Sequence, residues 1–300
     1  MRLQELTDRL DAYFRPEAFD EHDGWAFCFG PGGWEALLGR APAAFAATCN
    51  GLMISPRTPD PEIDRVYLIV FPQPARLERI VATERERGIP GALILTHHVT
   101  DFEARGSGLA PVPPAQFDAV REANIGLYVV HAPLDCHPET STSGALVDGL
   151  GLRRVGTFAP YVGGHAGVIG EQAPEPFGDF AARVRELCEL PALDPAQVRH
   201  AGRPVSRVAV IAGGGDDVDS LHEVLAADVD TYLTGTWWTP HQSAWADQNR
   251  AAVRAMLPEL TINLLGTTHN ASEQVVLRDQ VAPLLRGWGV DPMWLRCAEY

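Results

Sequence analysis

The sequence predicts an α/β fold with largely parallel sheets, arranged as two lobes. Short apolar runs of four to eight residues recur along the chain, and amphipathic stretches lie between them. An apolar run of this length is typical of a strand buried on both faces, and alternation of strands with helices indicates a parallel sheet. The composition, 46% hydrophobic and 21% charged, is that of a globular protein.

Six strands and six helices are expected from these patterns. The expected strands are Val66–Phe71, Ala92–Thr96, Leu127–His131, Val208–Ala212, Thr231–Thr234 and Thr261–Leu265. The expected helices are Pro74–Arg87, Pro114–Ala123, Phe177–Leu190, Val218–Ala227, Gln242–Met256 and Ser272–Arg286. Each helix is opened or closed by Pro, Gly, Asn or Asp, the residues that favour helix ends.

The middle of the chain has a different pattern. Residues 156–170 (GTFAPYVGGHAGVIG) form short strand-like pieces interrupted by glycine. We therefore place a second α/β lobe at residues 141–254. The first lobe is expected to comprise residues 1–140 and to be completed by residues 255–300, where the pattern returns to strand and then helix.

Charge and cysteine content exclude several classes of function. Lys and Arg number 24 against 39 Asp and Glu, a net charge of −15, so the average surface repels nucleic acid and anionic lipid. The five cysteines contain no CxxC pair, which argues against both a disulfide framework and a thiolate zinc site. No apolar run is long enough to cross a membrane, and the first 20 residues lack a signal-like apolar core. We expect a cytoplasmic protein without a membrane partner.

Polar side chains follow two of the expected strands. His97 and His98 come directly after ALILT, and His131 and Asp135 stand at and just beyond the end of the next strand. Ligands collect at the carboxyl ends of strands in open α/β sheets, so these side chains are expected to converge. The alternative is that His97 and His98 are ordinary loop histidines.

A third candidate follows the last expected strand, in the segment HNASE. On a helix, His269 and Glu273 are four residues apart and lie on one face, where they can supply two metal ligands. Alternatively, Asn270 is the N-cap and Glu273 completes a capping box. Spacing does not decide between these roles, which can coexist.

Together these segments supply more ligands than one four-coordinate ion needs. Two ions that share a bridging carboxylate would use all of them: His97, His98, Asp135, His269 and Glu273. Nitrogen and oxygen ligands without thiolate suit Zn, Mn, Fe, Co or Ni. Water activated by such ions is a hydrolytic nucleophile near neutral pH.

The chain resembles the dinuclear-metal-centre family known as GTP cyclohydrolase I type 2 homologues, or Nif-three-like proteins. The resemblance rests on DGW at 23–25, His97-His98, HxxxD at 131–135, GALVDGLGL at 144–152, VAVIAGGG at 208–215, YLTG at 232–235 and HxxxE at 269–273. It implies a toroidal homo-hexamer with two divalent metal ions per chain in a cleft between interlocked lobes. It also implies that His97, His98, Asp135 and His269 each bind one ion and that Glu273 bridges both.

The chain departs from the family pattern after the TG dipeptide, where Thr236 replaces the usual acidic residue. His241 matches a family histidine at a displacement of about one residue, and we expect it near the ligands or, equally, at a solvent-facing helix start. The glycines at 213–215 lack the spacing of a nucleotide loop and predict a tight turn.

These observations predict a metal-dependent hydrolase of a small substrate, with a nucleotide or other heterocycle as the candidate. Glu273 would bridge the ions, and His131 or His241 would carry a proton. The alternative is a non-catalytic metal-binding scaffold or protein-interaction ring.

Overall fold

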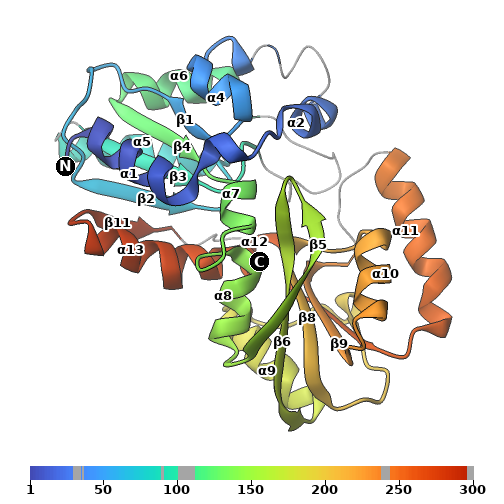
Figure 1. Cartoon of the computed structure of the whole chain (residues 1–300). Coiled ribbons are helices and arrows are strands. Elements are labelled where there is room, and N and C mark those ends of the chain that lie inside the picture. Colours follow the sequence, from blue (N-terminus) through green and yellow to red (C-terminus); the bar gives the residue numbers. More distant parts are fainter. Residues whose placement is uncertain (30–34, 36, 89–90, 101–111, 238–243, 296–300) are drawn as a thin grey trace. The chain divides into compact units, whose positions relative to one another are not determined.

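The computed structural model describes residues 1–29, 35, 37–88, 91–100, 112–237 and 244–295. Within these ranges the chain divides into two compact units, each with its own sheet (Figure 1). Unit 1 contains residues up to 134 and returns with residues 281–295, and unit 2 contains residues 135–280. The expected two-lobed α/β fold is confirmed.

Unit 1 is built on a mostly parallel sheet in the order β1-β4-β3-β2-β11. Its strands are β1 (Gly51–Ile54), β2 (Arg65–Ile69), β3 (Ala92–Thr96), β4 (Ile125–Val129) and β11 (Asp291–Trp294). Strand β1 runs antiparallel at one edge, and the other three pairings are parallel. The three central strands, β2, β3 and β4, correspond to the apolar runs at 66–71, 92–96 and 127–131 that were expected to form strands.

Helices flank this sheet. They are α1 (Leu3–Phe14), α2 (His22–Phe29), α4 (Ala43–Thr48), α5 (Pro74–Arg87), α6 (Pro114–Glu122) and α13 (Ala282–Gly287), and the short α7 (Ala132–Asp135) follows β4. One face of the sheet contributes Ile94 and Leu127 to a core that also holds Ile80 of α5 and Phe117 of α6. Alternate residues of buried strands thus face these helices, as period-two geometry requires.

Unit 2 has a mixed sheet in the order β5-β6-β8-β9-β10-β7. Its strands are β5 (Arg153–Tyr161), β6 (Gly164–Glu175), β7 (Val198–Arg199), β8 (Val205–Gly214), β9 (Thr231–Thr236) and β10 (Asn263–Gly266). Only β8, β9 and β10 pair in parallel. The expectation of largely parallel sheets therefore holds for unit 1 and needs correction for unit 2. Three pairings are antiparallel: β5–β6, β6–β8 and β7–β10. For β5 and β6 the physical reason is their two-residue connection through Val162 and Gly163, both with positive φ, since a connection this short permits only antiparallel pairing.

Helices cover both faces of the second sheet. They are α8 (Thr142–Gly149), α9 (Phe177–Leu187), α10 (Val218–Ala226), α11 (Ala244–Met256) and α12 (His269–Val276). Leu221 of α10 and Val253 of α11 share a core with Tyr232 of β9, whereas α8 and α12 pack against each other and against β8 (Figure 1). A π-helical turn (Leu277–Val281) leads from α12 to α13.

The observed division of the chain differs from the expected boundaries at 140 and 254. Strand β10 pairs with β9, so residues 255–280 belong to the second unit and only residues 281–295 complete the first. Among the described residues, no helix combines the length and apolar character that a membrane crossing needs.

Candidate metal centre

Backbone pairing in unit 1 carries three histidines to neighbouring strand ends. The peptide N–H of His97 donates to Ile69 O at 3.1 Å, and that of His98 donates to Val70 O at 2.9 Å. The ladder between β2 and β3 thus continues into the two histidines, while His131 directly follows β4 and Val130. As expected from the sequence, parallel strands place these residues at one edge of the sheet.

The three imidazoles form one group, which we call the imidazole group (His97, His98 and His131). Ring centres lie 4.4 Å apart for His97 and His98, 4.9 Å for His97 and His131, and 4.7 Å for His98 and His131. One nitrogen from each ring lies within 4.8 Å of the others, a spacing that could hold a metal ion. The sequence predicted that His97 and His98 converge with His131 and Asp135. The structure brings the three histidines together.

The orientation of His97 suits metal binding. Its Nδ1 lies 2.8 Å from the carbonyl oxygen of Val130. A carbonyl only accepts, so Nδ1 carries the proton and Nε2 is the acceptor in the neutral ring. Metal-binding histidines commonly donate their other ring N–H to a carbonyl or carboxylate in this way.

Two residues that the sequence reasoning missed surround His131. Glu21 Oε1 lies 2.6 Å from His131 Nδ1, and Glu21 Oε2 accepts hydrogen bonds from Asn50 Nδ2 at 2.8 Å and from the Ala132 N–H at 3.0 Å. Asn50 Oδ1 in turn accepts the backbone N–H of His131 at 2.8 Å. Glu21 stands two residues before the DGW motif, but no local pattern in the sequence marks it as a partner of His131.

Glu21 is ionised despite its burial. Desolvation of the buried carboxylate raises its pKa, but the nearby charge of His131 and hydrogen bonds from His131, Asn50 and Ala132 outweigh it and lower the pKa to about 2. A carboxylate that accepts several hydrogen bonds is stabilised in its charged form. It therefore acts only as an acceptor toward His131.

Aromatic side chains pack around the imidazole group. Phe71 stacks on His98 with ring centres 4.7 Å apart, and Trp25 meets His131 edge-on at 4.9 Å. Trp25 belongs to the DGW motif and lies on α2, directly after Glu21 and His22–Gly24. The motif thus contributes packing to the site.

In unit 2, the start of α12 decides between the two roles left open for Glu273. The N-cap is Thr268, whose side chain accepts the Ala271 N–H at 3.1 Å. Asn270 is inside the helix, so the capping box of Asn270 with Glu273 is wrong. Glu273 Oε1 instead lies 2.9 Å from His269 Nε2, one turn away on the same face.

A glycine makes room for this pair. A Cβ on Gly213, whose φ is +75°, would lie 2.3 Å from Glu273 Oε1 and 2.8 Å from His269 Nε2. The Gly213 N–H donates to Ser272 Oγ at 2.8 Å, which ties the end of β8 to α12. Gly213 and Gly214 are the last residues of β8, and only Gly215 lies in the connection to α10, so the turn expected over all three glycines is shorter than predicted. Gly213 lies directly against the His269–Glu273 pair.

The remaining predicted ligand, Asp135, ends α7. Its Oδ1 accepts the hydroxyl hydrogen of Thr142 at 2.6 Å, and one of its carboxylate oxygens lies within 4.8 Å of one from Glu273. Asp135, His269 and Glu273, all in unit 2, form a second set, which we call the carboxylate group. His241, the other predicted residue, lies outside the described residues.

A single family spans most of the chain. The model described as Duf34/NIF3 (NGG1p interacting factor 3) matches residues 44–292, which is well over half of the sequence. The chain belongs to the Duf34/NIF3 family. The resemblance inferred from the motifs is thereby confirmed.

Two similar proteins carry the name that the motif resemblance implies. A GTP cyclohydrolase 1 type 2 homolog from Halobacterium salinarum is 30% identical over 194 residues, covering 63% of this chain and 71% of the relative. A homolog of the same name from Chlamydia muridarum is 23% identical over 275 residues, covering 92% and 90%.

Solved structures share the fold. Protein ybgI, described as of unknown function, aligns with a TM-score of 0.65 at 19% identity and covers 100% of this chain and 99% of its own. A Thermus thermophilus crystal structure aligns with a TM-score of 0.63 at 20% identity, with coverage of 100% and 99%.

Thr236, where this NIF3 chain departs from the expected acidic residue, ends β9 and is buried. Its Oγ1 accepts a long hydrogen bond from Gln197 Nε2 at 3.5 Å, and Gln197 Oε1 also accepts the Trp237 N–H at 2.7 Å. The threonine thus contacts a neutral amide, where a carboxylate in its place would add a buried charge.

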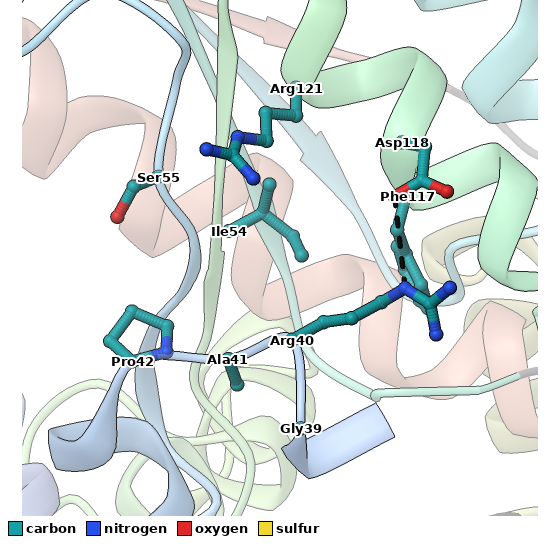
Figure 2. Close-up of a pocket in the computed structure, with 9 residues that line it drawn as sticks. All are labelled: Gly39, Arg40, Ala41, Pro42, Ile54, Ser55, Phe117, Asp118 and Arg121. Atoms are coloured by element: carbon teal, nitrogen blue, oxygen red, sulfur yellow. Dashed lines mark ion pairs between the residues drawn. The ribbon is translucent and has the colours of Figure 1, made fainter. Parts of the chain in front are cut away.

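A separate pocket of about 500 Å³ lies in unit 1 (Figure 2). Its nine lining residues include no histidine, and its carboxylate, Asp118, pairs with Arg40 at 3.7 Å. Figure 2 shows Arg40 extending toward Asp118 on α6. This pocket offers none of the predicted metal ligands.

Proposed function

We propose that this NIF3-family chain is a metal-dependent hydrolase that binds two divalent ions, drawn from Zn, Mn, Fe, Co and Ni. His97 and His98 of the imidazole group and the three residues of the carboxylate group supply the ligands, and Glu273 is the ligand common to both ions, as the family resemblance implies. The observation that carries the proposal is the convergence of one nitrogen from each of three imidazoles within 4.8 Å. Nitrogen and oxygen donors of this kind bind these metals.

The residues fit such ions in two further respects. His97 is already in the tautomer that leaves Nε2 as acceptor, and Gly213 leaves space beside His269 and Glu273 that any side chain would fill. A divalent ion, when bound, acts as a Lewis acid and brings the pKa of water into the neutral range. His131, hydrogen-bonded to ionised Glu21, is placed to take up a proton.

The substrate and the assembly are parts of the same proposal. Curated relatives carry the name GTP cyclohydrolase 1 type 2 homolog, so GTP is the first compound to test, followed by other nucleotides and cyclic amides. We further propose a homo-hexamer, which the family resemblance implies. The net charge of −15 argues against nucleic acid as a partner.

Metal content per chain tests the proposal, measured on protein purified without chelator or histidine tag. We expect close to two ions in the parent, loss of one in His97→Ala and loss of both in the shared-ligand variant Glu273→Ala. The controls are His222→Ala and Glu186→Ala, which change exposed residues of the same types on α10 and α9. Both are expected to keep the parent's metal content.

Two results would contradict this function. A parent that binds no ion after reconstitution with each of the five metals refutes the hydrolase outright. A parent that binds two ions but hydrolyses neither GTP nor the related compounds refutes the catalytic part and favours a metal-binding scaffold.

A further inference from the structure

We infer that Glu21 and Asn50 are positioning residues that fix His131 in its Nδ1–H tautomer, so that Nε2 is the acceptor of the ring. This inference rests on the proposed function, because it explains how His131 becomes useful beside metal ligands. Both residues belong to unit 1: Glu21 directly precedes α2, and Asn50 directly precedes β1. All the contacts that carry it lie within that unit.

The hydrogen bonds of Glu21 indicate which atoms donate and which accept. Glu21 Oε2 receives the Asn50 amide at 2.8 Å and the Ala132 N–H at 3.0 Å, and both of these groups only donate. The other oxygen, Oε1, lies 2.6 Å from His131 Nδ1. A glutamate side chain at neutral pH is a carboxylate, which only accepts hydrogen bonds, so Nδ1 donates.

Asn50 fixes the same residue through its backbone. Its Nδ2 donates to Glu21 and, at 3.2 Å, to the carbonyl of Thr48, while its Oδ1 accepts the His131 N–H at 2.8 Å. Both ends of the amide are therefore used. A flipped amide would place its NH₂ against the His131 N–H and its oxygen against two acceptors, Glu21 Oε2 and Thr48 O. Asn50 thus links the position of the His131 main chain to the carboxylate that holds its ring.

The tautomer matters because of the neighbours of His131. Its ring centre is 4.9 Å from that of His97 and 4.7 Å from that of His98. An acceptor nitrogen in this group is able to bind a metal ion or take a proton from water, whereas a protonated Nε2 does neither. Glu21 is largely buried, and desolvation of a buried carboxylate costs free energy. A neutral side chain would make hydrogen bonds with a purely structural role at a lower cost.

The substitution Glu21→Gln tests whether Glu21 decides which nitrogen of His131 carries the proton. The glutamine oxygen will turn toward Asn50 and Ala132, because two donors await it there, and its NH₂ will then face His131 Nδ1. Nδ1 must accept in that arrangement, so the proton moves to Nε2. A carboxylate with only a structural role has no such effect on the imidazole.

The experiment is ¹⁵N NMR of the imidazole nitrogens in metal-free full-length protein, at a pH above the range in which imidazole titrates. The His131 signals are assigned by their loss in His131→Gln. We expect Nδ1–H in the parent, Nε2–H in Glu21→Gln, and the parent pattern in Glu17→Gln, an exposed control in the same N-terminal region.

An Nε2–H tautomer in the parent would overturn the inference, and this measurement needs no variant to fold. An unchanged tautomer in folded Glu21→Gln would overturn it as well. Metal content measured on the same preparations keeps the two proposals apart: a parent that holds two ions but shows Nε2–H refutes the positioning role alone, whereas a metal-free parent refutes the proposed function.

Discussion

Gly213 offers the sharpest test of how the carboxylate group is built. It lies near the end of β8 with a φ of +75°, a conformation that other residues rarely adopt. A Cβ there would stand 2.3 Å from Glu273 Oε1, closer than real Cβ contacts. Gly213→Ala therefore affects the backbone and the ligand pair together.

The magnitude follows from these two effects. Left-handed backbone costs an alanine about 1–2 kcal/mol, and overpacking a well-packed site costs about 1–3 kcal/mol. We expect Gly213→Ala to lower the free energy of unfolding by about 2–5 kcal/mol. To reach ordinary contact, the Glu273 carboxylate must move by roughly 1 Å, whereas metal–ligand distances tolerate about 0.2 Å. We expect at least a tenfold loss of metal affinity.

Gly214→Ala is the matched control, since a Cβ on that exposed glycine meets nothing within 4 Å. Urea denaturation of metal-free protein gives the stability of each variant, and titration with Zn²⁺ gives the affinity. Equal affinities in Gly213→Ala and Gly214→Ala would refute the account, because the His269–Glu273 pair would then not depend on the space at Gly213.

Three further results are expected. Thr268→Ala should destabilise the protein by about 1 kcal/mol in urea denaturation through loss of the α12 N-cap, while Thr268→Ser should not; equal stability would refute the cap. The pKa of Glu21 is about 2 in the folded protein against an ordinary 4.5, so its contribution to the free energy of unfolding is present above pH 4.5 and is lost as the pH falls toward 2. Over that range the free energy of unfolding of the metal-free parent should fall by up to about 3 kcal/mol more than that of Glu21→Gln. Parallel plots of unfolding free energy against pH would contradict this. Burial raises the pKa of the Cys49 and Cys188 thiols to about 12, so iodoacetamide at pH 8 should label them only in denatured protein, as peptide mass spectrometry would show.

The proposed ligands could be named from the sequence because they are marked by local patterns. His97 and His98 end a run of buried strand residues, and His269 and Glu273 are spaced by one helical turn. Periodicity identifies such elements, and the geometry of parallel strands places their ends at one edge. Neither step requires knowledge of distant contacts.

Glu21 and Asn50 could not be found in this way. Glu21 is separated from His131 by 110 residues and Asn50 by 81, and neither belongs to a motif with its partner. Their roles arise only when β1 pairs with β4 and when Glu21, whose N–H donates to Thr48 O at 3.3 Å, is brought beside Asn50. The same limit applies to β10. Its residues predict a strand, but they do not indicate that this strand pairs with β9 in unit 2.

The start of α12 combines the proposed metal ligands with the residues that cap and anchor the helix. His269 and Glu273 form the proposed ligand pair, and the residues just before them, Thr268 and Ser272, have the same spacing of four. Ser272 Oγ donates back to the first turn, to Thr268 O at 3.1 Å or His269 O at 2.9 Å, and accepts the Gly213 N–H at 2.8 Å. Thr268 caps the helix, which leaves Glu273 without a capping role. The HxxxE spacing therefore indicates a ligand pair most strongly when another residue supplies the N-cap, because the carboxylate is then available for binding.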